Sequence, residues 1–304
     1  MYIVYGLMCL IFGTTFLGIK IGVDAGAPPF LFAGSRFFFA GVVVLLAVKL
    51  LKGSVMVPAG LRRDVMLVGI CMTGIMFGCL YWGERYVSSS VAALLAATTP
   101  IMIGVTEWVQ GVRDNTRIKV LGLLLSFAGV CTAILPALGM DASQEAVIAV
   151  IVILAAEGGS VYGTMIAKTV LNKGVSPFVL NGWQMLTGGM LLMLLSLFWE
   201  TQPVITYEVA ASWAYLVILG SLGGHGAYYW LVYRSGPLLP STWTYISPVI
   251  AQFVGYIVLA EYLSFYSLIG VVLVLGGIFL VSRAAAIDSW LVRLFKQKTS
   301  FYSD

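Results

Sequence analysis

Two ionisable side chains, Glu157 and His225, fall inside long apolar stretches of the sequence. If those stretches cross a bilayer, a charge near the centre costs roughly 2.5–3.5 kcal/mol on insertion scales, so each residue needs a reason to be there. Glu157 could bind a cationic group of a substrate or take up a proton. His225, the single histidine, could carry or sense protons because imidazole changes charge near physiological pH. The alternative for Glu157 is a neutral carboxyl that forms hydrogen bonds between helices. The alternative for His225 is a hydrogen-bond donor that only helps the helices to pack.

Polar residues follow Glu157 at helical spacing. Ser160, Thr164 and Lys168 are three, four and four residues further along, which places one polar stripe on one face of a helix. Glu157 lies about twelve residues into its apolar stretch, or about 18 Å deep at 1.5 Å per residue. The stripe is therefore expected to face protein or water rather than lipid.

Two prolines, Pro100 and Pro248, occupy equivalent places within apolar stretches. A proline inside a helix removes an amide donor and kinks or unwinds the chain, and such breaks at corresponding positions are typical of transporter binding sites. We expect the polar and aromatic residues around them to line a central cavity. These residues are Thr98, Thr99, Trp243, Thr244, Tyr245, Ser247 and Gln252. The competing interpretation is that the kinks only shape helix packing.

Arg36 and Gln184 also fall inside apolar stretches, at equivalent places near opposite ends. That placement suits gates or helix-tethering groups at the two ends of a transport pathway. We favour a structural role over substrate contact because arginine can reach the membrane interface or donate hydrogen bonds to neighbouring carbonyls. Six further residues lie near the ends of apolar stretches and are expected at the membrane interface. They are Lys20, Lys168, Tyr81, Trp82, Tyr229 and Trp230.

The sequence gives no sign of a metal site, a cofactor or an enzyme. His225 has no second histidine and no clustered cysteines or carboxylates with it, so a metal site is not expected. A membrane enzyme with Glu157 and His225 as acid and base is the rival hypothesis, but the short loops offer no convergent catalytic groups. No Walker motif or Gly-rich nucleotide loop is present, which argues against ATP-driven transport by this chain alone.

The composition is that of an integral membrane protein. Hydrophobic residues make up 60% of the 304 residues and charged residues 10%, and the mean hydropathy is +0.99, so too little polar surface exists to cover a soluble globule. All four cysteines lie in apolar stretches, which indicates buried free thiols. The net charge of +4 is explained by membrane topology and is not read as nucleic-acid binding.

The chain repeats itself at an offset of 148 residues. Small, rigid and aromatic residues recur at the same places in the hydrophobic pattern, which is hard to obtain by chance. The pairs are Lys20 and Lys168, Pro29 and Pro177, Gly34 and Gly182, Gly41 and Gly189, Tyr81 and Tyr229, Trp82 and Trp230, Pro100 and Pro248, Gly122 and Gly270, and Gly129 and Gly277. The chain is therefore predicted to be two copies of one unit.

About 20 apolar residues cross a bilayer as a helix, and on that basis we divide the chain into ten spans. They run approximately over 2–22, 30–50, 65–84, 88–108, 118–138, 146–167, 177–199, 210–232, 238–259 and 264–283. Five helices per unit is an odd number, so the second unit must enter the membrane from the opposite side. The expected fold is an all-α membrane protein made of two five-helix inverted repeats, residues 1–140 and 145–284.

The basic residues fix the predicted orientation. With a cytoplasmic N-terminus, the outer segments hold only Lys20 and Arg85, and Arg36 lies in a span, while all other lysines and arginines fall inside. By the positive-inside rule both termini are cytoplasmic, in a multi-pass protein of the cell membrane. Residues 285–304 form a basic tail that either lies along the inner leaflet as an amphipathic helix or is disordered.

Short motifs in both halves resemble the EamA-like family of drug/metabolite transporters. The first is Phe12-Gly13-Thr14-Thr15-Phe16-Leu17-Gly18-Ile19-Lys20, followed by Pro28-Pro29-Phe30 and Ala33-Gly34-Ser35-Arg36-Phe37. The second half resembles the family in Ser247-Pro248-Val249-Ile250-Ala251, in Glu261 and in Gly270 and Gly276-Gly277. The sequence departs from the family pattern at Phe12, where tryptophan is common, and in carrying Glu157 and His225 in spans that are usually uncharged.

What the resemblance implies is a ten-helix secondary transporter without a nucleotide-binding domain, most often an exporter of amino acids or other small metabolites or drugs. We predict alternating access between the two units, with protons as the candidate coupling ion. A passive channel is the second hypothesis. The predicted partners are a small-molecule substrate and the lipid bilayer, with no nucleic acid and no cofactor, and the protein is expected to be a monomer or a homodimer.

Overall fold

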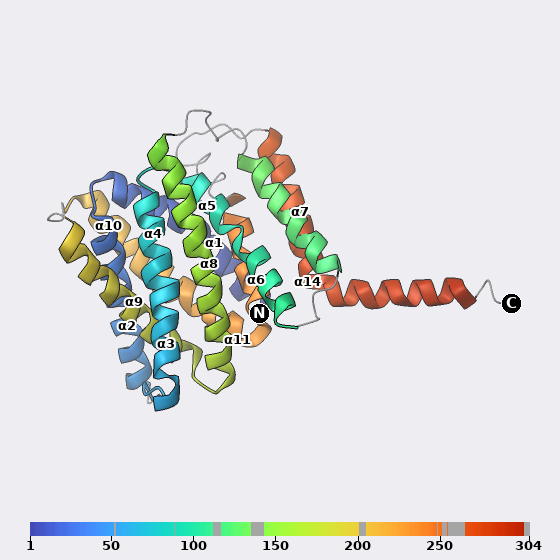
Figure 1. Ribbon diagram of the computed structural model, residues 1–304, viewed down its shortest axis with the longest axis horizontal. Coiled ribbons are helices and arrows are strands. Elements are labelled where there is room, and N and C mark those ends of the chain that lie inside the picture. Colours follow the sequence, from blue (N-terminus) through green and yellow to red (C-terminus); the bar gives the residue numbers. More distant parts are fainter. Residues whose placement is uncertain are drawn as a thin grey trace.

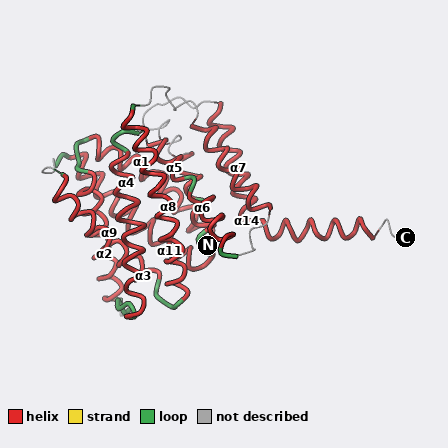
Figure 2. Tube along the Cα trace, viewed as in Figure 1, coloured by secondary structure: helices red, strands yellow, loops and turns green. Residues whose placement is uncertain are grey.

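The computed structural model describes residues 1–51, 53–87, 89–111, 117–134, 143–200, 205–247, 249–250, 254 and 265–300. Within these ranges every element is a helix and no strand occurs, as the composition predicts. The helices form a bundle from which the C-terminal helix projects (Figures 1 and 2).

The elements of the two halves follow the same order. The first half contains α1 (Tyr2–Asp24), α2 (Pro29–Leu50), η1 (Ala59–Leu61), α3 (Arg62–Gly69), η2 (Ile70–Ile75), α4 (Met76–Gly83), α5 (Ser89–Ala96), α6 (Thr99–Val109) and α7 (Arg117–Ile134). The second half contains α8 (Gln144–Asn172), α9 (Pro177–Trp199), α10 (Tyr207–Tyr215), η4 (Leu216–His225), α11 (Gly226–Ser235), α12 (Leu238–Ser241) and α14 (Phe265–Ser300).

Five helices among the described residues are long and apolar enough to cross a membrane. They are Tyr2–Asp24, Pro29–Leu50, Ala59–Gly83, Gln144–Asn172 and Pro177–Trp199. They coincide with predicted spans one, two, three, six and seven, so the chain is a multi-pass membrane protein. The full count of ten stays a prediction, because parts of the remaining spans lie outside the described residues.

Prolines start the second helix of each half. Pro29 and Pro177 stand at the first helical position of α2 and α9, where the missing amide hydrogen costs nothing. At α2 the next two amides are satisfied from the other half: the backbone N–H groups of Phe30 and Leu31 donate to the two carboxyl oxygens of Glu200, at 2.6 and 2.8 Å. A carboxylate at a helix N-terminus also complements the helix dipole, so Glu200 ties the end of α9 to the start of α2.

The third helix of each half has a π-helical segment at equivalent places. η2 and η4 are both π-helical, and residues 70–75 correspond to 218–223 at the 148-residue offset. A π segment widens the helix locally, and such segments are frequent at functional sites. His225 is the last residue of η4.

The predicted fourth span is interrupted near Pro100. α5 ends at Ala96 and α6 begins at Thr99, so the chain makes a turn just before the proline, as expected from its missing amide. Its repeat partner Pro248 lies outside the described residues.

Glycines bring repeat-related helices into contact. A Cβ at Gly34 would lie 3.0 Å from the Gly189 carbonyl oxygen, and one at Gly41 would lie 2.8 Å from that of Gly182. Gly34 and Gly41 are themselves the repeat partners of Gly182 and Gly189, so α2 and α9 cross antiparallel with exchanged partners. Only glycine allows backbones this close.

The same exchange occurs between α7 and α14. A Cβ at Gly122 would lie 2.7 Å from the Gly277 carbonyl oxygen, and one at Gly129 would lie 2.8 Å from that of Gly270. The repeat partner of Gly122 is Gly270, and that of Gly129 is Gly277. Both contacts are those of an inverted repeat with a two-fold axis between the halves.

The last helix runs further than the hydrophobic pattern indicates. The predicted last span ends at Arg283, whereas α14 continues without a break from Phe265 to Ser300. No proline or glycine stands between residues 284 and 300 to end it. The first part of α14 lies beside α7, and the rest extends away from the bundle (Figure 1). A surface position for residues 285–304 stays a prediction.

Candidate functional site

A cavity in the middle of the bundle is lined by residues of both halves. The lining is formed by Phe12, Thr15, Phe16, Ile19, Arg36, Met72, Met76, Phe77, Leu80, Ala96, Thr99, Glu157, Ser160, Gln184, His225, Tyr228, Tyr229, Ser241, Trp243 and Thr244. The centres of water molecules can occupy about 70 Å³ of it, while about 10–15 Å³ is enough for one water. In this state the cavity has room for a few waters, and the walls must move to admit a larger solute.

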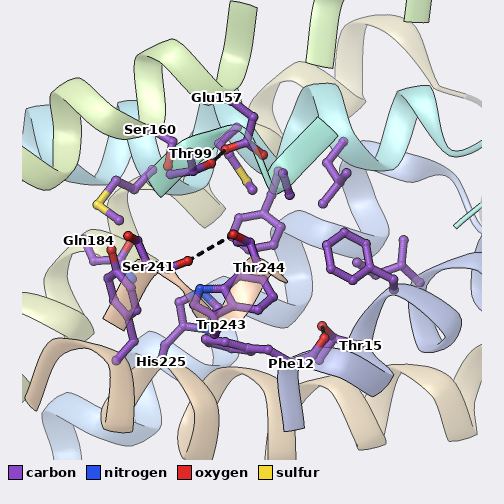
Figure 3. A pocket seen from close by; sticks show the side chains of 18 of the residues that line it. Phe12, Thr15, Thr99, Glu157, Ser160, Gln184, His225, Ser241, Trp243 and Thr244 are labelled. Carbon is purple, nitrogen blue, oxygen red and sulfur yellow. Dashed lines mark hydrogen bonds between the residues drawn. The ribbon is translucent and has the colours of Figure 1, made fainter. Parts of the chain in front are cut away.

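Glu157 is almost completely buried on the wall formed by α8. Its side chain is 2% exposed, and its Oε2 accepts a hydrogen bond from the Thr99 hydroxyl at 2.6 Å. The other oxygen, Oε1, is buried without a partner among the described residues. Thr99 can reach the carboxyl because the chain breaks between α5 and α6. Figure 3 shows Glu157, Thr99 and Ser160 grouped on one side of the cavity.

Arg36 lines the same cavity and is 1% exposed. Its Nε donates to Ser221 Oγ at 2.9 Å and its Nη1 to the Tyr81 hydroxyl at 2.5 Å, and the guanidinium lies 4.5 Å from the Phe37 ring centre. Among the described residues its partners are neutral, and the ion pairs there join other residues. Arg36 is thus a buried cation without a protein anion in the described part of the chain.

His225 lies on the Arg36 side of the cavity. Its ring packs edge-on against Phe12 and Phe37, with centroids 5.1 and 5.5 Å away, and its Nδ1 is 3.0 Å from the Gly220 carbonyl oxygen. That carbonyl can only accept, so we assign the proton to Nδ1, which leaves Nε2 as an acceptor. The π segment places this carbonyl five residues before the histidine, within reach of the ring.

Aromatic rings fill the space between the two polar walls. Trp243 contacts Phe12 and Phe16, with ring centroids 4.4 and 6.1 Å apart, and Figure 3 shows Trp243 between the Glu157 and His225 sides. Sequence reasoning identified Trp243 as a cavity residue but missed Phe12, Phe16 and Phe77. In a chain this apolar, nothing in the local pattern separates a ring that faces the cavity from one that faces lipid.

The predicted site residues divide into three groups. Those that line the cavity are Thr99, Glu157, Ser160, His225, Trp243, Thr244, Arg36 and Gln184. Those described but outside the lining are Thr98, Pro100, Thr164, Tyr245 and Ser247. Pro248 and Gln252 lie outside the described residues. Thr164 is buried and bonds to the Ser160 carbonyl at 2.9 Å, while Tyr245 packs in a separate apolar cluster.

Two tyrosines expected at the membrane interface are core residues instead. Tyr81 is fully buried and accepts from Arg36, and Tyr229 is 1% exposed and lines the cavity. Position near the end of a span did not predict their side-chain direction. Lys168 also differs from a simple interfacial anchor, because its Nζ pairs with Glu107 Oε1 at 2.9 Å and links α8 to α6.

The site brings an acidic and a basic side chain to one cavity. Glu157 brings a carboxyl with one free oxygen, and Arg36 brings a guanidinium on the side of the cavity that holds His225. A Cβ at Gly220 would meet Arg36 Nη2 at 2.7 Å, so the absence of a side chain there makes room for the cation. This arrangement can bind a small solute that carries both an acidic and a basic group.

Known proteins share both the sequence pattern and the fold. The EamA-like transporter family matches residues 1–135 and 147–283. The uncharacterized inner membrane transporter YedA of Escherichia coli (strain K12) is 27% identical over 252 residues, which cover 81% of this chain and 78% of YedA. The uncharacterized transporter YetK of Bacillus subtilis (strain 168) is 28% identical over 261 residues, which cover 83% and 78%. One crystal structure superposes with a TM-score of 0.78 over 93% of this chain and 96% of its own, at 18% identity.

Proposed function

Because this chain belongs to the EamA-like transporter family, we propose that it is a secondary active transporter that exports amino acids or other small metabolites by alternating access. Both relatives named above are named as transporters, and YedA as one of the inner membrane. Those names give neither a substrate nor a coupling ion, and the geometry of the cavity supports our proposal for both.

The observation that carries the proposal is that one cavity holds a buried guanidinium, Arg36, and a buried carboxyl, Glu157. A buried charge without a partner costs several kcal/mol, and neither Arg36 nor Glu157 has an oppositely charged side chain among the described residues. A solute with a carboxylate and an ammonium group would supply both. Arginine binds carboxylates with two parallel hydrogen bonds, and the free Oε1 of Glu157 can accept from an ammonium group.

Proton coupling is proposed through Glu157. When the cavity holds no cation, a carboxylate there has one hydroxyl donor and is almost completely buried, so the protonated form is favoured. Arrival of an ammonium group favours the ionised form. Proton and substrate would then exchange at one carboxyl, which is the basis of antiport.

The cavity supports a carrier rather than a passive channel. The rings of Phe12, Phe16 and Trp243 line one side of it, and both halves of the chain contribute to its wall. One site shared between two repeat-related halves fits rocking of the halves around a fixed point.

The test is efflux from proteoliposomes loaded with pooled amino acids and small metabolites, with and without an imposed pH gradient, read by mass spectrometry. We expect selective loss of solutes that carry both a carboxylate and an amine, and faster loss with the gradient. Protein-free liposomes give the leak rate. Counterflow of labelled substrate against an unlabelled gradient separates a carrier from a channel, and its absence would reject alternating access.

A further inference from the structure

A second buried carboxyl, Glu84, lies outside the cavity. It follows α4 directly, is 0% exposed, and neither carboxyl oxygen has a hydrogen-bond partner among the described residues. Asp24 at the end of α1 lies at the same end of the bundle, which the distribution of basic residues predicts to be the outer one. The cavity mechanism makes no use of Glu84.

Lys20 connects Glu84 to a second carboxylate. Its Nζ pairs with Asp24 Oδ1 at 2.8 Å and also donates to the backbone carbonyl of Glu84 at 3.0 Å. The side chain of Asp24 is 57% exposed and that of Lys20 is 27% exposed. The ammonium group therefore contacts an exposed carboxylate and the backbone of the residue that carries the buried carboxyl.

Among the described residues, the other elements around Glu84 bring no compensating charge. From α8, Ile153 and Ala149 approach Gly83, and both are apolar. From α2, Arg36 reaches α4, but its Nη1 donates to the hydroxyl of Tyr81, which lies one turn before Glu84. Arg85 stacks 5.8 Å from the Tyr86 ring centre. Lys20 and Asp24 are the charged side chains that act on the Glu84 carboxyl.

An ionised carboxylate without water or donors costs several kcal/mol. Removing its proton requires a cation to approach, and Lys20 can do so by leaving Asp24, which solvent can then hydrate. We propose that Glu84 is a proton-binding site near the outer end of the bundle, and that Lys20 moves from Asp24 to Glu84 when that proton leaves.

The exchange balances without other reactants. The O–H bond of Glu84 breaks and its proton passes to solvent, the ion pair between Lys20 and Asp24 separates, and one between Lys20 and Glu84 forms. Total protein charge falls by one. The site requires no substrate, so the proposal holds whatever solute the cavity carries.

The test is infrared difference spectroscopy of the purified full-length protein in lipid, titrated with pH and read in the stretching band of protonated carboxyl groups. We expect wild-type protein to lose a component of this band as pH rises, and Glu84→Gln to lack that component at every pH. Glu157→Gln is the matched control, since it removes the buried carboxyl of the cavity and should leave this component in place. An unchanged component in Glu84→Gln would overturn the proposal.

Two further variants test the movement of Lys20. Lys20→Met removes the cation, so the Glu84 component should persist to higher pH. Asp24→Asn removes the competing carboxylate, so it should disappear at lower pH. Each shift is expected to be about one pH unit, a ten-fold change in proton affinity. Equal titration in both variants would contradict the exchange, and size-exclusion profiles like that of the wild type confirm that each variant is folded.

Discussion

Thr99 donates its hydroxyl to one oxygen of Glu157 at 2.6 Å, and the other oxygen has no hydrogen-bond partner in the described part of the chain. The first residue of α6 thereby bonds the middle of α8, across the interface between the two halves of the chain. If one half moves against the other, this hydrogen bond must either break or move with both helices. We therefore expect transport to depend on the charge state of the Glu157 carboxyl.

Glu157→Gln keeps the size of the side chain and an acceptor for Thr99 but removes the charge. Hydrogen bonds to charged groups contribute about 1.5–3 kcal/mol, so affinity for an amine-bearing substrate should fall about ten-fold to a hundred-fold. Stimulation by a pH gradient should vanish. Proteoliposome transport measures both, with Glu208→Gln, an exposed carboxyl at the start of α10, as the control. Stimulation equal to wild type would exclude Glu157 as the proton carrier.

Arg36→Lys keeps the positive charge but cannot make the two parallel bonds that a guanidinium offers to a carboxylate. We expect weaker transport of carboxylate-bearing solutes and little change for the corresponding amines without a carboxylate. Competition between the two solute classes in the same vesicles gives the ratio directly.

The control for Arg36 is Tyr81→Phe, which removes the 2.5 Å hydrogen bond to Arg36 and leaves the cation in place. It should preserve the preference between the solute classes. Loss of the same preference in Tyr81→Phe would mean that Arg36 acts by holding α2 to α4 and does not contact substrate.

His225→Phe places in η4 the residue type found at its repeat partner, Phe77. Because a protonated imidazole would stand beside the Arg36 cation, we expect His225 to stay neutral and the shape of the transport pH profile to be unchanged. The Gly220 carbonyl would lose its 3.0 Å partner, so stability should fall by about 1–3 kcal/mol. Thermal unfolding and transport against pH check the two parts, and a profile that loses its pH dependence would make His225 a proton carrier.

Gly41→Ala should destabilise the contact between α2 and α9. The added Cβ would lie 2.7 Å from the Leu186 backbone nitrogen and 2.8 Å from the Gly182 carbonyl oxygen, and overpacking of this kind costs about 1–3 kcal/mol. Gly158→Ala is the matched control in another span, since nothing lies within 4 Å of its Cβ. Thermal unfolding in detergent should separate the two, and equal midpoints would contradict the close crossing.

The sequence was sufficient to predict features that depend on composition and on backbone chemistry. A proline followed by an apolar run of spanning length located α2 and α9, and the missing amide of Pro100 located the break between α5 and α6. Both signals are local, because they depend on the backbone chemistry of a few neighbouring residues and not on tertiary contacts.

Features that depend on side-chain direction could not be obtained in this way. Phe12 and Phe16 line the cavity while Leu7 and Leu10 on the same helix are exposed, yet all four are equally apolar, because lipid and protein interior favour the same residues. The π segments η2 and η4 have no residue signature either, so the bond between His225 and the Gly220 carbonyl was not foreseen.

The exchanged glycine contacts also bear on the second conformation that alternating access requires. Gly34 contacts Gly189 and Gly41 contacts Gly182. Because these glycines are repeat partners, α2 and α9 contact each other through equivalent surfaces. If α2 and α9 exchanged backbone conformations, the contacts between these glycines would be preserved. We therefore expect the second conformation to resemble this one with the shapes of α2 and α9 exchanged, and distances between spin labels on the two helices would check this.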